Sequence, residues 1–149
     1  MARTEGFVFK FSTEMFDYKG EIPVEANAGN RFYGRDVAEF LCDHLARDGL
    51  ELGYIDEDWG WLVTGTMSGK KSLDVAIYNH GVGDVMHAPP VATNTWSLLV
   101  EMFESRKLLG FIPKRHAIAC EPWLLQLLEM ALTIEGIHLI EAAKGNEPF

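Results

Sequence analysis

Apolar residues alternate with polar or small residues in several short segments, and this period of two restricts the fold more than any other feature of the chain. Side chains on a β-strand point to opposite faces in turn, so each such segment has one apolar face to bury. The clearest sets are Phe7, Phe9 and Phe11; Leu73, Val75 and Ile77; and Trp96, Leu98, Val100 and Met102. A helix is the alternative for the last set, because apolar residues there also fit helical spacing, but we favour a strand.

Two other segments repeat with the period of an amphipathic helix. The first covers residues 35–48, with an apolar stripe of Val37, Phe40, Leu41, His44 and Leu45. The second begins near Pro122, a favoured first-turn residue, and ends near Gly136. Strands and helices together predict an α+β fold, a mostly antiparallel sheet of about five to six strands with two amphipathic helices packed on one face. The 149 residues fit a single α+β domain covering residues 1–149.

The remaining segments are assigned by their flanking turn residues. We expect short strands at residues 50–55 and 137–142, and a hairpin that joins residues 59–66 to residues 72–78. Residues 79–95 show no period and contain two prolines, which predicts a long loop. Residues 105–119 are interpreted as a basic connection, and residues 144–149 as a polar tail.

The stretch from Asp56 to Trp61 combines three successive acids, Asp56, Glu57 and Asp58, with two tryptophans on either side of Gly60. On a strand, Trp59 and Trp61 would share one face, and the acids would lie in a solvated turn at the mouth of that strand. Such an arrangement would offer an aromatic anchor inside a negative rim. The alternative is that both tryptophans are core residues, the acids are merely solvated, and Gly60 marks a bulge.

Charge is distributed unevenly along the chain, whose formal net charge is −9. Residues 36–58 contain eight acids and one base, Arg47, so this segment alone carries −7. The opposite bias occurs at Arg106, Lys107, Lys114 and Arg115, with no acid between them. Because phosphates would be repelled by most of the surface, nucleic acid is not the expected partner. An acidic patch could instead steer a basic protein towards the chain.

The sequence gives no sign of export or membrane insertion. Its longest apolar run is far below the roughly 18 residues of a membrane span, and its first residues lack a secretory signal pattern. Cys42 and Cys120 are the only cysteines and have no metal-like spacing. We therefore expect reduced thiols, a cytoplasmic location and no membrane partner.

No residue pattern in the chain satisfies the requirements of a catalytic or metal site. Residues 65–72 resemble a phosphate loop, but the glycines are one residue too close and Lys71 occupies the place of the required Ser or Thr. His80, His87 and Asp84 share one loop without a recognisable ligand spacing. Cys120 lies just before a helix, where a thiol pKa can fall, but its neighbours suggest burial. We expect no enzyme, no cofactor and no metal.

Two segments carry a resemblance to a known class of proteins: PVEANAGNRFYGRD at residues 23–36 and EDWGW at residues 57–61. With the Trp96 strand and the C-terminal helix–strand pair, the chain resembles small bacterial α+β proteins of the immunity type. In polymorphic-toxin and type VI secretion systems these proteins sit beside a toxin and block it. The resemblance covers about the middle half of the chain. It implies an acidic surface that occludes the active site or substrate cleft of a cognate toxin, with no catalytic residues of its own.

The residues and the resemblance lead to the same hypothesis, that the chain is an antitoxin-like inhibitor with a basic partner. Its predicted contact residues are Glu39, Asp43, Asp56, Glu57, Asp58, Trp59 and Trp61. Two alternatives stay open. One is a small-molecule-binding protein or enzyme that uses the 79–95 loop as a lid. The other is a self-assembling subunit, for example a homodimer.

Overall fold

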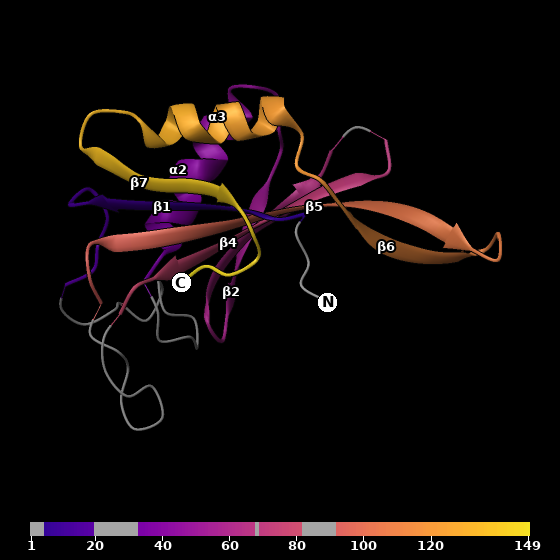
Figure 1. Cartoon of the computed structure of the whole chain (residues 1–149), viewed down its shortest axis with the longest axis horizontal. Coiled ribbons are helices and arrows are strands. Elements are labelled where there is room, and N and C mark those ends of the chain that lie inside the picture. Colours follow the sequence, from indigo (N-terminus) through magenta and orange to yellow (C-terminus); the bar gives the residue numbers. More distant parts are fainter. Residues whose placement is uncertain (1–4, 20–32, 68, 82–91) are drawn as a thin grey trace.

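The computed structural model describes residues 5–19, 33–67, 69–81 and 92–149. Within these ranges the chain forms seven strands and two helices, namely β1 (Phe7–Thr13), α2 (Arg35–Ala46), β2 (Gly53–Glu57), β3 (Gly60–Thr66), β4 (Lys71–Asn79), β5 (Thr95–Leu108), β6 (Ile112–Ile118), α3 (Pro122–Leu132) and β7 (Ile137–Lys144). The strands belong to one sheet, and the two helices lie on one side of it (Figure 1).

The strand order is β2-β3-β4-β5-β1-β7, with β6 beside β5, and all neighbours are antiparallel. The 14-residue strand β5 organises this sheet, because it pairs with β4 along one side and with two different strands along the other. Its first half pairs with β1 and its second half with β6. The β5–β6 hairpin therefore continues beyond the end of β1 and projects from the body (Figure 1).

The main core lies between the sheet and the two helices. All the alternating apolar residues of β4 and β5 predicted to share a face are buried there, namely Leu73, Val75 and Ile77, and Trp96, Leu98, Val100 and Met102. The helices contribute mainly Val37, Leu41 and Leu45 from α2, and Leu124, Leu128 and Leu132 from α3. The start of α2 approaches the sheet closely, since a Cβ added to Gly34 would lie 2.9 Å from Trp61 Cδ1.

The opposite face of the sheet carries a smaller apolar cluster. Val8, Ala76 and Leu99 are its buried members, and Trp59, Leu62 and Tyr78 pack around them. The C-terminal residues return across this face, where the ring centroid of Phe149 lies 5.5 Å from that of Tyr78 and 4.8 Å from that of His80. The tail predicted to be polar thus places an aromatic ring on the helix-free face.

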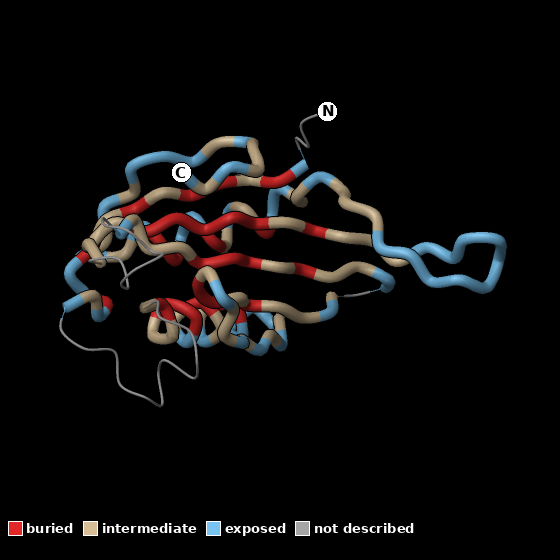
Figure 2. The backbone as a smooth tube through the Cα atoms, turned by 90° about the horizontal axis from the view of Figure 1, so that it is seen from below, coloured by how far each residue is buried: buried red, intermediate tan, exposed pale blue. Residues whose placement is uncertain are grey.

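The predicted α+β fold is confirmed, with two helices on one face of an antiparallel sheet. The preference for a strand at Trp96 and the positions of both helices are also confirmed. The interpretation of residues 105–119 as a connection was wrong, because they include the last four residues of β5 and all of β6. Most of this hairpin is exposed on both faces (Figure 2). Its strands therefore have no face to bury, and their sequence shows no alternation of apolar and polar residues.

Candidate protein-binding edge

The acids of the β2–β3 hairpin occupy both a strand and its turn. Asp56 pairs with Trp61, and Glu57 pairs with Gly60, which leaves Asp58 and Trp59 as a two-residue connection. The predicted strand at residues 50–55 therefore begins three residues late and ends at Glu57. Asp56 and Glu57 lie on strand β2 and not in a solvated loop, so their side chains point to opposite faces of the sheet edge.

The two tryptophans lie on opposite faces, which corrects the prediction that they share one. Trp61 belongs to the helix-covered core, whereas Trp59 packs with the smaller cluster on the other face. The alternation rule fails here because Trp59 is a turn residue and is not part of strand β3. Its ring instead stacks on that of Tyr78, with centroids 4.8 Å apart and planes inclined by 25°.

Trp61 packs against the hairpin from the helix-covered core and is not available as a contact residue. Its side chain is only 3% exposed. Its ring centroid lies 6.0 Å from that of Tyr54 on β2. Trp59 is half-buried and is therefore the one tryptophan of the pair that a partner could reach. Ile55, 49% exposed on strand β2, adds an apolar side chain to the same edge.

Helix α2 brings further acids to this part of the molecule because it packs against β2 and β3. The Tyr54 hydroxyl donates a hydrogen bond of 2.8 Å to Glu39 Oε1, which joins the helix to the edge strand. Arg35 Nε lies 3.2 Å from the same oxygen. Asp43 is exposed one turn farther along α2. We call the set Glu39, Asp43, Asp56, Glu57 and Asp58 the acidic edge.

Most of this charge is not compensated by the described part of the chain. Among residues 5–19, 33–67, 69–81 and 92–149, no Lys or Arg forms a salt bridge with Asp43, Asp56, Glu57 or Asp58. In addition, β2 ends the strand order, so one side of its backbone pairs with no other described strand. An edge strand of this kind is a natural place for another chain to bind. The structure thus places uncompensated acids, a reachable tryptophan and an open strand edge together.

The loop at residues 79–95, considered above as a lid, is described only at its two ends, since residues 82–91 lie outside the described part of the chain. Asn79 fastens these ends: its Nδ2 donates to the carbonyl oxygen of Thr93 at 2.7 Å, and its Oδ1 accepts from Thr93 N at 2.9 Å. Next to it, His80 Nε2 lies 2.6 Å from Ser97 Oγ. Ser97 is fully buried, so this pair is a structural contact at the base of the loop.

The protonation of His80 should make the free energy of unfolding depend on pH. Burial of the ring, aided by the charge of Lys10, lowers the pKa of His80 from its ordinary value of 6.5. Protonation of His80 is therefore less favourable in the folded chain than in the unfolded chain. The stability that neutral His80 contributes is fully present above pH 6.5 and is lost as the pH falls through the lowered pKa of the folded state. We expect an NMR titration of the imidazole to give a midpoint below 6.5. The free energy of unfolding should fall more steeply below pH 6 for the wild type than for His80→Gln, and equal slopes would contradict this.

Other candidate chemistry is not supported by the geometry of the described residues. Burial raises the pKa of the Cys120 thiol to about 11, the opposite of what a nucleophilic cysteine requires. Cys42 and Cys120 are both free thiols, as expected. No three His, Cys, Asp or Glu side chains gather as metal ligands within the described ranges, and His87 and Asp84 lie outside them. No helix of the described chain is long and apolar enough to cross a bilayer.

Sequence reasoning missed the Asn79–Thr93 clamp, the return of Phe149 to the sheet and the projecting β5–β6 hairpin. The first two join residues far apart in the chain, for which the sequence holds no local signal. The hairpin did have one, Gly110 as a turn residue between two strands.

Comparison with known proteins gives no relative: no family model, no curated protein and no solved structure matches the chain.

Proposed function

We propose that the chain is a protein inhibitor of the immunity type, which binds a basic toxin domain through the acidic edge and blocks its active site or substrate cleft. The observation that carries this proposal is the run Asp56–Glu57–Asp58 at the end of an edge strand, with no salt bridge to a described Lys or Arg. The resemblance at residues 23–36 and 57–61 points to the same class, and most of the first segment lies outside the described residues.

The edge combines the two components that protein interfaces use. Uncompensated acids attract a basic surface over a distance and raise the rate of encounter. Once the partner is docked, a half-buried aromatic ring beside an apolar side chain supplies the apolar contact where binding energy concentrates. Trp59 and Ile55 have these roles here, whereas Trp61 holds the strand in place from the core.

The direct test is protection of a bacterial host against a candidate toxin. The candidate is the C-terminal domain of the protein encoded by the gene next to that of this chain. Coexpression of the wild type should restore growth, and Asp56→Lys/Glu57→Lys/Asp58→Lys should restore it poorly. With purified proteins at low salt, the triple variant should bind about 10–100-fold more weakly, mainly through a slower association rate. The difference should shrink as salt screens the charges.

A matched variant separates the edge from overall charge. Glu129→Lys/Glu135→Lys/Glu141→Lys changes three exposed acids on and after α3, and each triple variant shifts the net charge from −9 to −3. The control should keep most of the affinity and the protection. Equal losses in both variants, or an undiminished association rate in the edge variant, would overturn the proposed surface. Absence of binding to the neighbouring domain would overturn the proposed class.

A further inference from the structure

The β5–β6 hairpin projects from the body and ends in apolar side chains. We call residues 105–115 the arm, and Leu108, Leu109, Phe111 and Ile112 its tip. Leu109 and Phe111 are 76% and 72% exposed, the highest values among the exposed large apolar residues apart from Phe149. Leu109 also has a φ of 54°, a left-handed conformation that a leucine rarely adopts. Both the solvent and the backbone therefore disfavour an apolar residue at this position.

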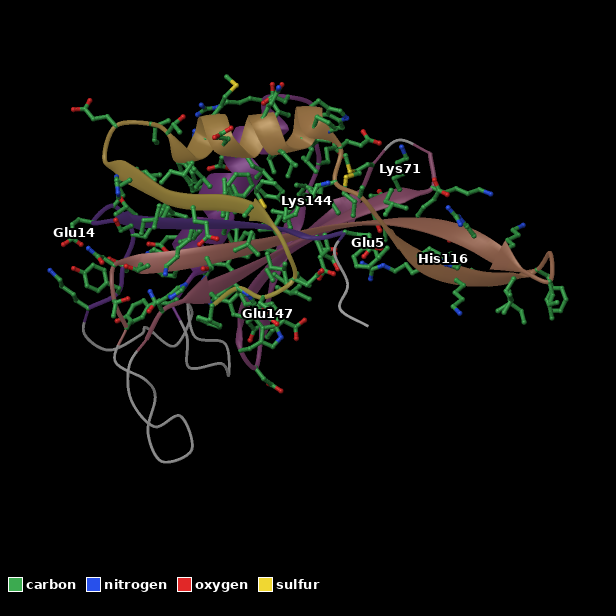
Figure 3. The ribbon with its side chains drawn as sticks, in the orientation of Figure 1. Glu5, Glu14, Lys71, His116, Lys144 and Glu147 are labelled. Atoms are coloured by element: carbon green, nitrogen blue, oxygen red, sulfur yellow. The ribbon has the colours of Figure 1, made fainter. Side chains whose placement is uncertain are left out.

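Cations follow the tip in a fixed order along the arm. Leu108 pairs with Ile112, then Lys107 with Pro113, Arg106 with Lys114, and Ser105 with Arg115. Arg106 and Lys114 thus face each other although like charges across a strand pair repel. Lys107 and Lys114 form no salt bridge with a described carboxylate. Figure 3 shows side chains projecting from both strands of the arm beyond the labelled His116.

This polarity varies with distance along the arm and not from one face to the other. A protein groove would select an apolar face along the hairpin. A lipid surface, whose apolar interior lies behind a layer of phosphates, selects an apolar end followed by cations. At about 3.3 Å per residue, the three cationic rungs lie about 3–10 Å behind the Leu108–Ile112 pair. This range overlaps the depth of about 5–10 Å to which interfacial amphipathic helices bury their apolar faces.

The acidic body compensates two of the four cations of the arm and leaves two. Arg106 Nε lies 3.0 Å from Glu104 Oε1, and Arg115 pairs with Asp74, whereas Lys107 and Lys114 have no salt bridge to a described carboxylate. The arm holds four of the 13 cations and none of the 22 acids, so the rest of the chain, with nine cations, carries −13. Lys107 lies about 10 Å beyond Glu104 along the strand, which exceeds the screening length of about 8 Å at physiological salt. The root of the arm is held firmly, because Arg115 Nη2 lies 2.7 Å from Asp74 Oδ2 and its guanidinium lies 3.7 Å from the centroid of the Phe103 ring.

We propose that the arm is a membrane-surface anchor, which inserts its apolar tip between anionic lipids while Lys107 and Lys114 bind their phosphates. This site is separate from the acidic edge, and it goes beyond the proposed inhibition of a toxin. It also departs from the expectation of no membrane partner, which considered only export and segments that span the bilayer.

Cosedimentation with vesicles tests the proposal. The full chain should bind mixed phosphatidylglycerol–phosphatidylcholine vesicles, and bind pure phosphatidylcholine much more weakly. Leu109→Ser/Phe111→Ser should lower the affinity by about tenfold or more, and Lys107→Gln/Lys114→Gln should lower it and weaken its dependence on salt. Met130→Ser, which removes a 68% exposed apolar side chain on α3, is the matched control and should bind like the wild type.

Three outcomes would overturn the anchor: no binding to the anionic vesicles, binding that the tip variant retains, or binding that Met130→Ser lowers as much as the tip variant does. Sedimentation without lipid tests whether the tip binds a second copy of this chain and not a lipid surface. If the wild type self-associates and the tip variant does not, while vesicle binding is equal in the two, the arm joins protein chains and the proposal fails. Because every substituted side chain on the arm is exposed, equal melting temperatures should verify that the variants remain folded.

Discussion

Replacement of Trp61 by alanine is expected to lower the free energy of unfolding by about 3–5 kcal/mol, the range measured for large-to-small changes at buried aromatic residues. The Trp61 side chain is 3% exposed and lies between the start of α2 and strand β3. Its removal would leave a cavity beneath Gly34, and the loss of stability within this range depends on how far the start of α2 can move to fill that cavity. Stability of this size is a large part of what a domain possesses.

Denaturation with urea, followed by far-ultraviolet circular dichroism, measures this loss. The matched variant is Trp59→Ala, which removes an identical side chain two residues away from the half-buried stack on Tyr78. We expect it to lower the free energy of unfolding by only about 1–2 kcal/mol, because less apolar area returns to water. A loss at Trp59 equal to that at Trp61 would mean that both rings lie in one core, as the alternation of the sequence suggested.

The elements that could be predicted from sequence are those with one face in water and one in the core. In β4, Leu73, Val75 and Ile77 alternate with more polar residues because only one side of that strand meets the helices. Helix α2 shows its stripe for the same reason. The local period of apolar residues thus indicates which side of an element is buried, and this was sufficient to predict the fold class.

Features without such a local period could not be predicted. The arm is exposed to solvent on both faces, so its strands show no apolar period. Trp59 was assigned to a strand because the sequence does not state where the two-residue turn lies. The position of Phe149 over Tyr78 depends on the chain returning across the sheet, which no local pattern encodes. The structure places the predicted acids at the protein surface and buries Trp61 in the core, so the predicted pair of tryptophans on one face was wrong. The role of the acids in binding stays a prediction.

Replacement of Gly60 by alanine is expected to lower the free energy of unfolding by at least about 3 kcal/mol, more than ordinary overpacking does. A Cβ at this position would lie 2.4 Å from the carbonyl oxygen of Ile77 on β4, a distance at which the backbone must move. The atom in the way belongs to the neighbouring strand and not to a flexible side chain, so no rotamer change relieves the contact. The strain would fall on β3 and β4, beside the acidic turn.

The matched control is Gly53→Ala on strand β2, where an added Cβ meets nothing within 4 Å. We expect this change to be neutral or to raise stability by a few tenths of a kcal/mol, because alanine restricts the unfolded chain more than glycine does. Urea denaturation compares the two variants, and hydrogen exchange should show faster opening of the β3 and β4 amides in Gly60→Ala alone. Equal stability of the two variants would mean that β3 and β4 separate easily at this point, and that the turn carrying Asp58 and Trp59 is not held in a fixed position for a partner.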